Sequence, residues 1–107
     1  MIELEPSEAL TQVVFVHDYI QLVFHGLTLS LYGTISVVSK DEQLERASSG
    51  FCDRLVGLIG QRATAATDLP ENELNLRFES GVSIQVRAGD GPETWELHRA
   101  GLIVVGR

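Results

Sequence analysis

The chain has 107 residues, of which 44% are hydrophobic and 21% are charged, a composition typical of a globular domain and not of a disordered segment. The formal net charge is −7 and the eight Lys and Arg residues are scattered, which argues against direct nucleic-acid binding, since that needs clustered positive charge. No apolar run approaches the roughly 20 residues of a membrane-spanning helix, and the acidic N-terminal stretch lacks the features of a signal peptide. We therefore expect a single domain over residues 1–107, located in the cytoplasm, where the one cysteine, Cys52, would stay reduced.

The first strong pattern lies in residues 19–33, where apolar residues occupy every second position on both sides of Gly26. Such alternation is typical of strands with one buried face, and a glycine between two alternating runs predicts a hairpin turn. The residues predicted to face inward are Ile20, Leu22, Phe24, Leu27, Leu29 and Leu31. One further strand on each side, within residues 11–18 and 33–39, would make this half of the chain a four-stranded meander.

Residues 40–47 are compatible with two structures. Ser39 and Glu42 have the spacing of a capping box, which would start a helix. The same stretch could instead be a short polar strand that returns from a turn at Lys40 and Asp41. We favour the strand.

One helix is predicted around residues 50–60, in the link between the two halves of the chain. Its apolar stripe, at helical spacing, consists of Phe51, Leu55, Leu58 and Ile59. Ser48 or Ser49 can cap the start of this helix, Asp53 complements the dipole of its first turn, and Gly60 can end it.

The alternating pattern recurs in residues 73–89, where a second hairpin is predicted around Ser80 and Gly81. Its inward positions are Leu74, Leu76, Phe78, Val82, Ile84 and Val86. Leu22 corresponds to Leu76 and Phe24 to Phe78, so the matched residues belong to the scaffold.

These patterns predict a mainly β protein (α+β) with an internal pseudo-repeat over about residues 10–39 and 61–98. Two similar antiparallel meanders would form a sandwich or a curled barrel, and the helix would link the halves. A last strand is expected at residues 102–105, after a turn at Ala100 and Gly101. If this apolar strand lies at a sheet edge it invites pairing between two chains, so both a monomer and a homodimer stay open.

The second hairpin and the segment after it resemble a family of small bacterial domains of unknown function. The residues that carry the resemblance are Leu74, Leu76, Phe78, Gly81, Ile84, Val86, Asp90, Glu93, Trp95, Glu96 and Leu97. A looser match precedes them at Leu58, Gly60, Ala63 and Ala66. Members of this kind are also similar to small immunity proteins found beside bacterial toxins, and the resemblance implies no catalytic residue.

Side chains suited to catalysis or metal binding are few. His17, His25 and His98 lack the spacing that would place two rings on one metal ion, and we expect them on the surface without partners. Cys52 adjoins the apolar stripe of the predicted helix, so we expect it in the core; the alternative is a nucleophile activated at the helix N-terminus. We predict no catalytic residue, no metal site and no cofactor.

Acidic residues crowd the second half of the chain and form the candidate partner-binding set together with one tryptophan. The set consists of Glu71, Glu73, Glu79, Asp90, Glu93, Trp95 and Glu96. Trp95 is either a core residue, which we favour, or an interface anchor between two glutamates. The set predicts an acidic protein-binding domain that docks a basic protein, in the manner of an immunity protein neutralising a toxin.

Three other interpretations stay open. The first is a domain that binds or senses a small molecule in a cavity between two curved sheets. The second is a structural protein without a ligand. The third, an enzyme, ranks last because the sequence supplies no catalytic constellation.

Overall fold

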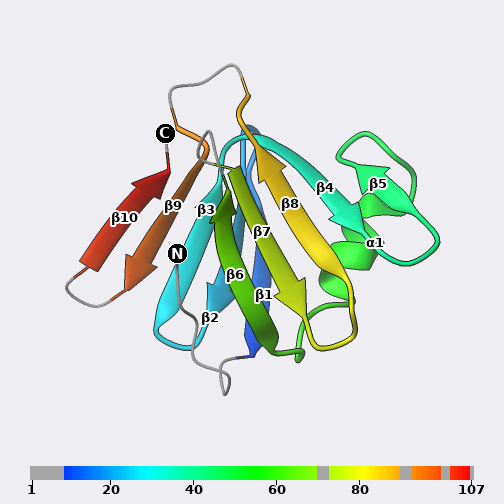
Figure 1. Ribbon diagram of the computed structural model, residues 1–107, viewed down its shortest axis with the longest axis horizontal. Helices are drawn as coiled ribbons and strands as arrows, with labels where there is room; N and C mark the ends of the chain where they lie inside the picture. The colour runs from blue at the N-terminus through cyan, green and yellow to red at the C-terminus, as the bar shows by residue number, and fades with distance from the viewer. Residues whose placement is uncertain (1–8, 70–72, 90–92, 100–101, 107) are drawn as a thin grey trace.

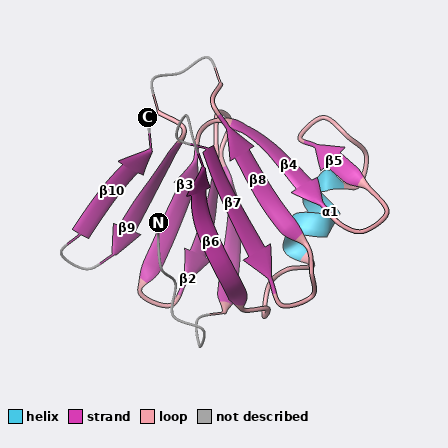
Figure 2. Cartoon of the chain, viewed as in Figure 1, coloured by secondary structure: helices cyan, strands magenta, loops and turns pink. Residues whose placement is uncertain are grey.

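Two antiparallel sheets form the fold, in a computed structural model that describes residues 9–69, 73–89, 93–99 and 102–106 (Figure 1). The first sheet has the order β1 (Leu10–Phe15), β2 (Ile20–Phe24), β3 (Leu27–Leu31), β9 (Trp95–Arg99) and β10 (Leu102–Gly106). The second sheet has the order β5 (Gln43–Glu45), β4 (Thr34–Val38), β8 (Ser83–Arg87), β7 (Glu73–Phe78) and β6 (Ala63–Leu69). The sheets pack face to face as a sandwich and stay open, so the predicted mainly β fold is confirmed and the barrel alternative is not the structure (Figure 2).

Each sheet contains strands from both halves of the chain. Strands β1, β2 and β3 are consecutive, but β4 then crosses to the second sheet and pairs with β8, while β9 crosses back and pairs with β3. The strand orders suit the predicted pseudo-repeat, because β1–β3 and β6–β8 occupy the same places in their sheets, although the duplication itself stays a prediction. Neither half completes a sheet alone, and the two halves are interlocked.

The two crossing segments meet at Gly33. The backbone N–H groups of Tyr32 and Gly33 both donate to the carbonyl oxygen of Thr94, at 2.9 and 3.0 Å. A Cβ atom on Gly33 would lie 2.0 Å from the carbonyl oxygen of Arg87. Glycine is therefore required here by the close approach of two backbones.

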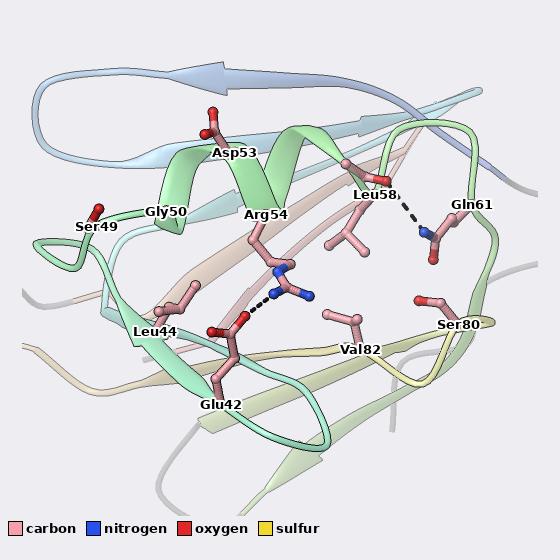
Figure 3. Close-up of a pocket in the computed structure, with 11 residues that line it drawn as sticks. Glu42, Leu44, Ser49, Gly50, Asp53, Arg54, Leu58, Gln61, Ser80 and Val82 are labelled. Carbon is pink, nitrogen blue, oxygen red and sulfur yellow. Dashed lines mark hydrogen bonds and ion pairs between the residues drawn. The ribbon is translucent and has the colours of Figure 1, made fainter.

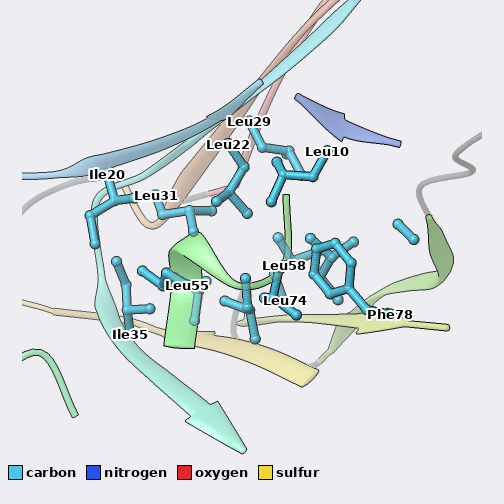
Figure 4. Close-up of a cluster of buried hydrophobic side chains, with 14 of the residues drawn as sticks. Leu10, Ile20, Leu22, Leu29, Leu31, Ile35, Leu55, Leu58, Leu74 and Phe78 are labelled. Carbon is cyan, nitrogen blue, oxygen red and sulfur yellow. The ribbon is translucent and has the colours of Figure 1, made fainter. Parts of the chain in front are cut away.

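The core lies between the inner faces of the two sheets, as the alternation predicted (Figure 4). All twelve residues predicted to face inward from the two hairpins are buried. At the hairpin turns Gly26 and Gly81 have φ of 75° and 94°, values that side chains other than glycine rarely adopt. The two hairpin predictions are confirmed.

Helix α1 (Phe51–Val56) contacts β1 of the first sheet and β4 of the second, and Figure 1 shows it beside β4. Phe51, Leu55 and Leu58 are buried as predicted. The prediction for Ile59 is wrong, since its side chain is 43% exposed. The helix ends at Val56, and the turns that follow rotate Ile59 away from the core.

The ends of α1 also differ from the prediction. Its N-cap is Gly50, with φ of 87° and no side-chain capping bond, whereas Ser48 or Ser49 was expected to cap. The Ser48 hydroxyl instead accepts a hydrogen bond from the N–H of Glu45 at 3.0 Å, which closes the turn before the helix. Asp53 lies in the first turn as expected, and Gly57, three residues before the predicted Gly60, is the C-cap.

The strand interpretation of residues 40–47 is confirmed. β5 pairs antiparallel with β4, and the N–H of Ser39 donates to the carbonyl oxygen of Glu42 at 2.9 Å to close the turn between them. The predicted last strand is β10, an edge strand of the first sheet, whereas the turn predicted at Ala100 and Gly101 lies outside the described residues. No helix in the described part of the chain is long and apolar enough to cross a membrane.

Candidate functional site

Two tyrosines meet on the outer face of the first sheet, the face directed away from the second sheet. Tyr19 precedes β2 and Tyr32 follows β3, and the pairing of Ile20 with Leu31 places both tyrosines at the same end of this hairpin. Because Ile20 and Leu31 are buried in the core, the alternation of side chains directs the tyrosines outward. Their ring centroids are 5.1 Å apart with the planes tilted by 49°, a favourable aromatic geometry.

Two of the predicted glutamates lie beside this pair. In the pairing of β3 with β9, Glu96 lies directly opposite Ser30, on the same outer face. Burial is the main cause that raises the pKa of the Tyr32 hydroxyl above its ordinary value, and the negative charges of Glu96 and Glu93 raise it further. We call the surface made by Tyr19, Tyr32, Glu93 and Glu96 the tyrosine–glutamate face.

A small polar network fixes the side chains of this face. The side-chain amide of Gln21 donates to the Ser30 hydroxyl at 3.2 Å, and Ser30 in turn shares a hydrogen bond with Tyr32, which offsets part of the rise in its pKa. Ser30 is only 1% exposed although it points to the outer face, because its neighbours cover it. His98 contacts the Glu96 carboxylate through Nε2. The face is thus held in place before any partner arrives.

The structure separates the other predicted partner-binding residues from this face. Glu73 begins β7 of the second sheet. Glu79 follows the end of β7, where its carboxylate accepts a hydrogen bond from the N–H of Arg62 at 2.8 Å. Trp95 is 3% exposed, which places it in the core as favoured above, with little surface to offer a partner. Glu71 and Asp90 lie outside the described residues.

The histidines lie near their predicted places, but two of them have partners. His17 lies exposed in the turn before β2, with Nε2 3.6 Å from Oδ1 of Asp18. His98 contacts Glu96, so the expectation of partnerless surface histidines is wrong for both. His25 is exposed beside Gly26. Among the described residues no group of three or more His, Cys, Asp or Glu side chains could hold a metal ion.

Cys52 is exposed, so its predicted place in the core is wrong. Phe51 and Leu55, four residues apart, direct one face of α1 into the core. Cys52 directly follows Phe51, and one residue turns an α-helix by about 100°. The side chain of Cys52 therefore points away from the buried face.

Two hollows lie at the α1 end of the sandwich. The first, about 620 Å³, lies between α1, β5 and the β7–β8 turn, with Leu44, Leu58 and Val82 on its apolar side (Figure 3). Arg54 reaches from α1 toward Glu42 and forms an ion pair with it across this hollow. The second hollow, about 790 Å³, shares Glu42, Arg54 and Val82 with the first and lies at the β4–β5 and β7–β8 turns.

No protein-family model, no curated protein and no solved structure matches this chain. The class of protein that the fold defines is a two-sheet antiparallel β-sandwich with exchanged strands. The resemblance to the family of small bacterial domains, and through it to immunity proteins, stays a prediction.

Proposed function

We propose that this chain is a non-enzymatic protein-binding domain that docks a basic protein on the tyrosine–glutamate face. The observation that carries the proposal is the contact pair of Tyr19 and Tyr32 beside the carboxylates of Glu93 and Glu96. A Lys or Arg side chain of a partner can lie over an aromatic ring while it donates hydrogen bonds to a carboxylate. Tyrosine is also enriched among the residues that contribute most to binding free energy at interfaces.

The surrounding charges support a basic partner. The outward positions on β2, β3 and β9 whose side chains are described are Gln21, Val23, Thr28, Ser30, Glu96 and His98, with no Lys or Arg among them. With a net charge of −7, the chain attracts a basic protein and speeds the encounter at low salt. The resemblance to immunity proteins suggests that this partner is a toxin domain, which the chain would meet in the cytoplasm.

A titration with an arginine-rich peptide, followed by two-dimensional NMR at low and at high salt, tests the docking face. Glu96→Gln should weaken binding roughly tenfold, the loss expected when a charge-assisted hydrogen bond is removed. Asp53→Asn makes the same change in net charge on α1, away from the face, and should weaken binding less than about twofold. Equal losses in the two variants would show that only net charge matters and would refute the proposed face.

The identity of the partner needs a separate test. For any basic toxin domain found encoded beside its gene, the chain is co-expressed with that domain in bacteria, and growth is compared with and without the chain. Growth restored by the chain but not by its Glu96→Gln variant is the expected result. Equal killing in all three cultures would refute the neutralising role while leaving the peptide titration unaffected.

A further inference from the structure

The second hollow combines several positively charged and hydroxyl side chains in an acidic protein. It lies where the β4–β5 turn meets the β7–β8 turn, and we call it the turn hollow. The donors that line it are Ser39, Lys40, Arg54, Arg77 and Ser80. Three of the eight Lys and Arg residues of the chain therefore line one hollow of about 790 Å³.

The two arginines of the turn hollow come from opposite faces of the second sheet. Leu76 and Phe78 are buried in the core, so Arg77 between them points outward from the sheet. Arg54 comes from α1, which packs on the inner side through Phe51 and Leu55. The two guanidinium groups thus approach one hollow around the end of the sheet, and this convergence is not a consequence of neighbouring positions in the sequence.

The hydrogen-bond donors of the turn hollow have few hydrogen-bond or ion-pair partners within the described part of the chain. Arg54 is paired with Glu42, whereas the side chains of Lys40 and Arg77 form no ion pair with any described residue. The Ser39 hydroxyl makes one long hydrogen bond, at 3.5 Å, to the carbonyl oxygen of Glu42. Asp41 and Glu42 offset two of the three positive charges, which leaves the hollow with a net positive charge in a chain of net charge −7.

We propose that the turn hollow binds a phosphate group, either as free inorganic phosphate or as the phosphomonoester of a small metabolite. A phosphate presents several oxygens, which matches donors that arrive from two turns, strand β7 and a helix. The planar guanidinium of Arg77 binds two of these oxygens, and Lys40 adds a point charge. Arg54 exchanges the Glu42 carboxylate for phosphate. Because the overall charge of the chain repels anions, binding depends on this local convergence.

The test is an NMR titration of the full chain with inorganic phosphate and, in a second arm, with glycerol phosphate, at constant ionic strength maintained with sodium chloride. Phosphate should shift the backbone amides of residues 39–42 and 79–82. Tighter binding of glycerol phosphate would identify a phosphomonoester as the ligand class, and weaker binding of glycerol phosphate than of inorganic phosphate would identify the free ion. Absence of saturable shifts in these two turns in either arm would overturn the proposal.

Variants make the assignment specific to the hollow. Arg77→Gln and Lys40→Gln, both at exposed positions, should each weaken phosphate binding roughly tenfold. Arg87→Gln is the matched control, because Arg87 is also exposed at the end of a strand of the second sheet but does not line the hollow. Glu42→Gln should tighten binding several-fold, since it frees Arg54. The proposal would be overturned if Arg77→Gln and Arg87→Gln weakened phosphate binding equally. It would also be overturned if the Glu42→Gln variant bound phosphate more weakly than the wild type.

Discussion

Phe24 and Phe78 occupy corresponding positions in the two hairpins, and their rings stack in the core with centroids 6.4 Å apart and planes 16° apart. Phe24 comes from β2 in the first sheet and Phe78 from β7 in the second, so this contact joins the two layers of the sandwich. Each ring is at most 2% exposed.

Phe78→Leu should lower the free energy of unfolding by about 1–2 kcal/mol, because it removes the ring contact and leaves a small void. Urea denaturation followed by tryptophan fluorescence measures the change. Phe15→Leu is the control, since Phe15 is 42% exposed, and it should change stability by less than about 0.5 kcal/mol. In a double-mutant cycle with Phe24→Leu the coupling should be about 0.5–1.5 kcal/mol; a coupling of zero would contradict the stacked contact.

Gly33→Ala should destabilise the protein where the two crossing segments meet. The added Cβ would lie 2.0 Å from the carbonyl oxygen of Arg87, and backbone atoms cannot move aside cheaply. We expect a loss of at least about 1–3 kcal/mol, the range for forced overpacking. Gly57→Ala introduces the same methyl group at a position with φ of −63° and should be neutral or slightly stabilising. Thermal unfolding of the two variants gives the comparison, and equal melting temperatures would show that the crossing tolerates a side chain.

The sequence predicted the elements better than their pairing. The alternation around Gly26 and Gly81 identified both hairpins and every inward residue in them, because a buried strand face imposes a period of two. The pairing of β3 with β9 and of β4 with β8 joins strands far apart in the chain, and local patterns do not encode it. A helix of only six residues also left too few positions for the period to decide where Cys52 and Ile59 point.

The candidate site was predicted only in part. Glu93 and Glu96 were singled out by their charge, but Tyr19 and Tyr32 were not, because each lies next to a predicted strand and looks isolated in the sequence. A signal was nevertheless present, since both tyrosines lie one position outside the hairpin pair formed by Ile20 and Leu31. The turn hollow gave no such signal, because its donors come from two turns, strand β7 and a helix, which meet only in the folded chain.

Alkaline pH should destabilise the protein partly through Tyr32, whose pKa is raised above its ordinary value of 10.0, mainly by burial. The folded state holds the phenolic proton more tightly than the unfolded state does. This contribution to stability is fully present below the unfolded pKa and is lost as pH rises through the folded pKa. Tyr32→Phe should therefore show a shallower loss of unfolding free energy above pH 10 than the wild type.

The spectroscopic titration of Tyr32 also tests the geometry of the tyrosine–glutamate face. The carboxylate of Glu96 raises the pKa of Tyr32, so Glu96→Gln should lower that pKa, as measured by the absorbance of the ionised phenol. Subtraction of the Tyr32→Phe titration isolates this residue. An unchanged pKa in Glu96→Gln would mean that the two side chains are not close.

A hydrogen bond between the side chains of Ser36 and Glu45 connects the short edge strand β5 to β4. We expect acid pH to weaken this hydrogen bond. The Ser36 hydroxyl donates to Oε2 of Glu45 at 2.6 Å, and the side-chain amide of Gln43 donates to Oε1 at 3.1 Å. The hydrogen bond from Ser36, followed by the one from Gln43, lowers the pKa of Glu45 below its ordinary value of 4.5. The stabilisation from a lowered carboxyl pKa is present above the unfolded pKa and is lost as pH falls through the folded pKa.

Ser36→Ala should therefore raise the pKa of Glu45 toward 4.5 and make the unfolding free energy less dependent on pH in the acid range below that value. The side-chain carboxyl carbon of Glu45, followed by NMR from pH 7 to pH 2, reports the pKa directly. Ser83→Ala is the control, because Ser83 lies on β8 opposite Val38, without a hydrogen bond to Glu45 among those of the described residues, and it should leave the titration unchanged. If both variants move the pKa of Glu45 equally, the Ser36 hydroxyl is not its main hydrogen-bond donor. If Ser36→Ala alone moves it, the Ser36 hydroxyl is the main donor that holds the pKa of Glu45 below its ordinary value.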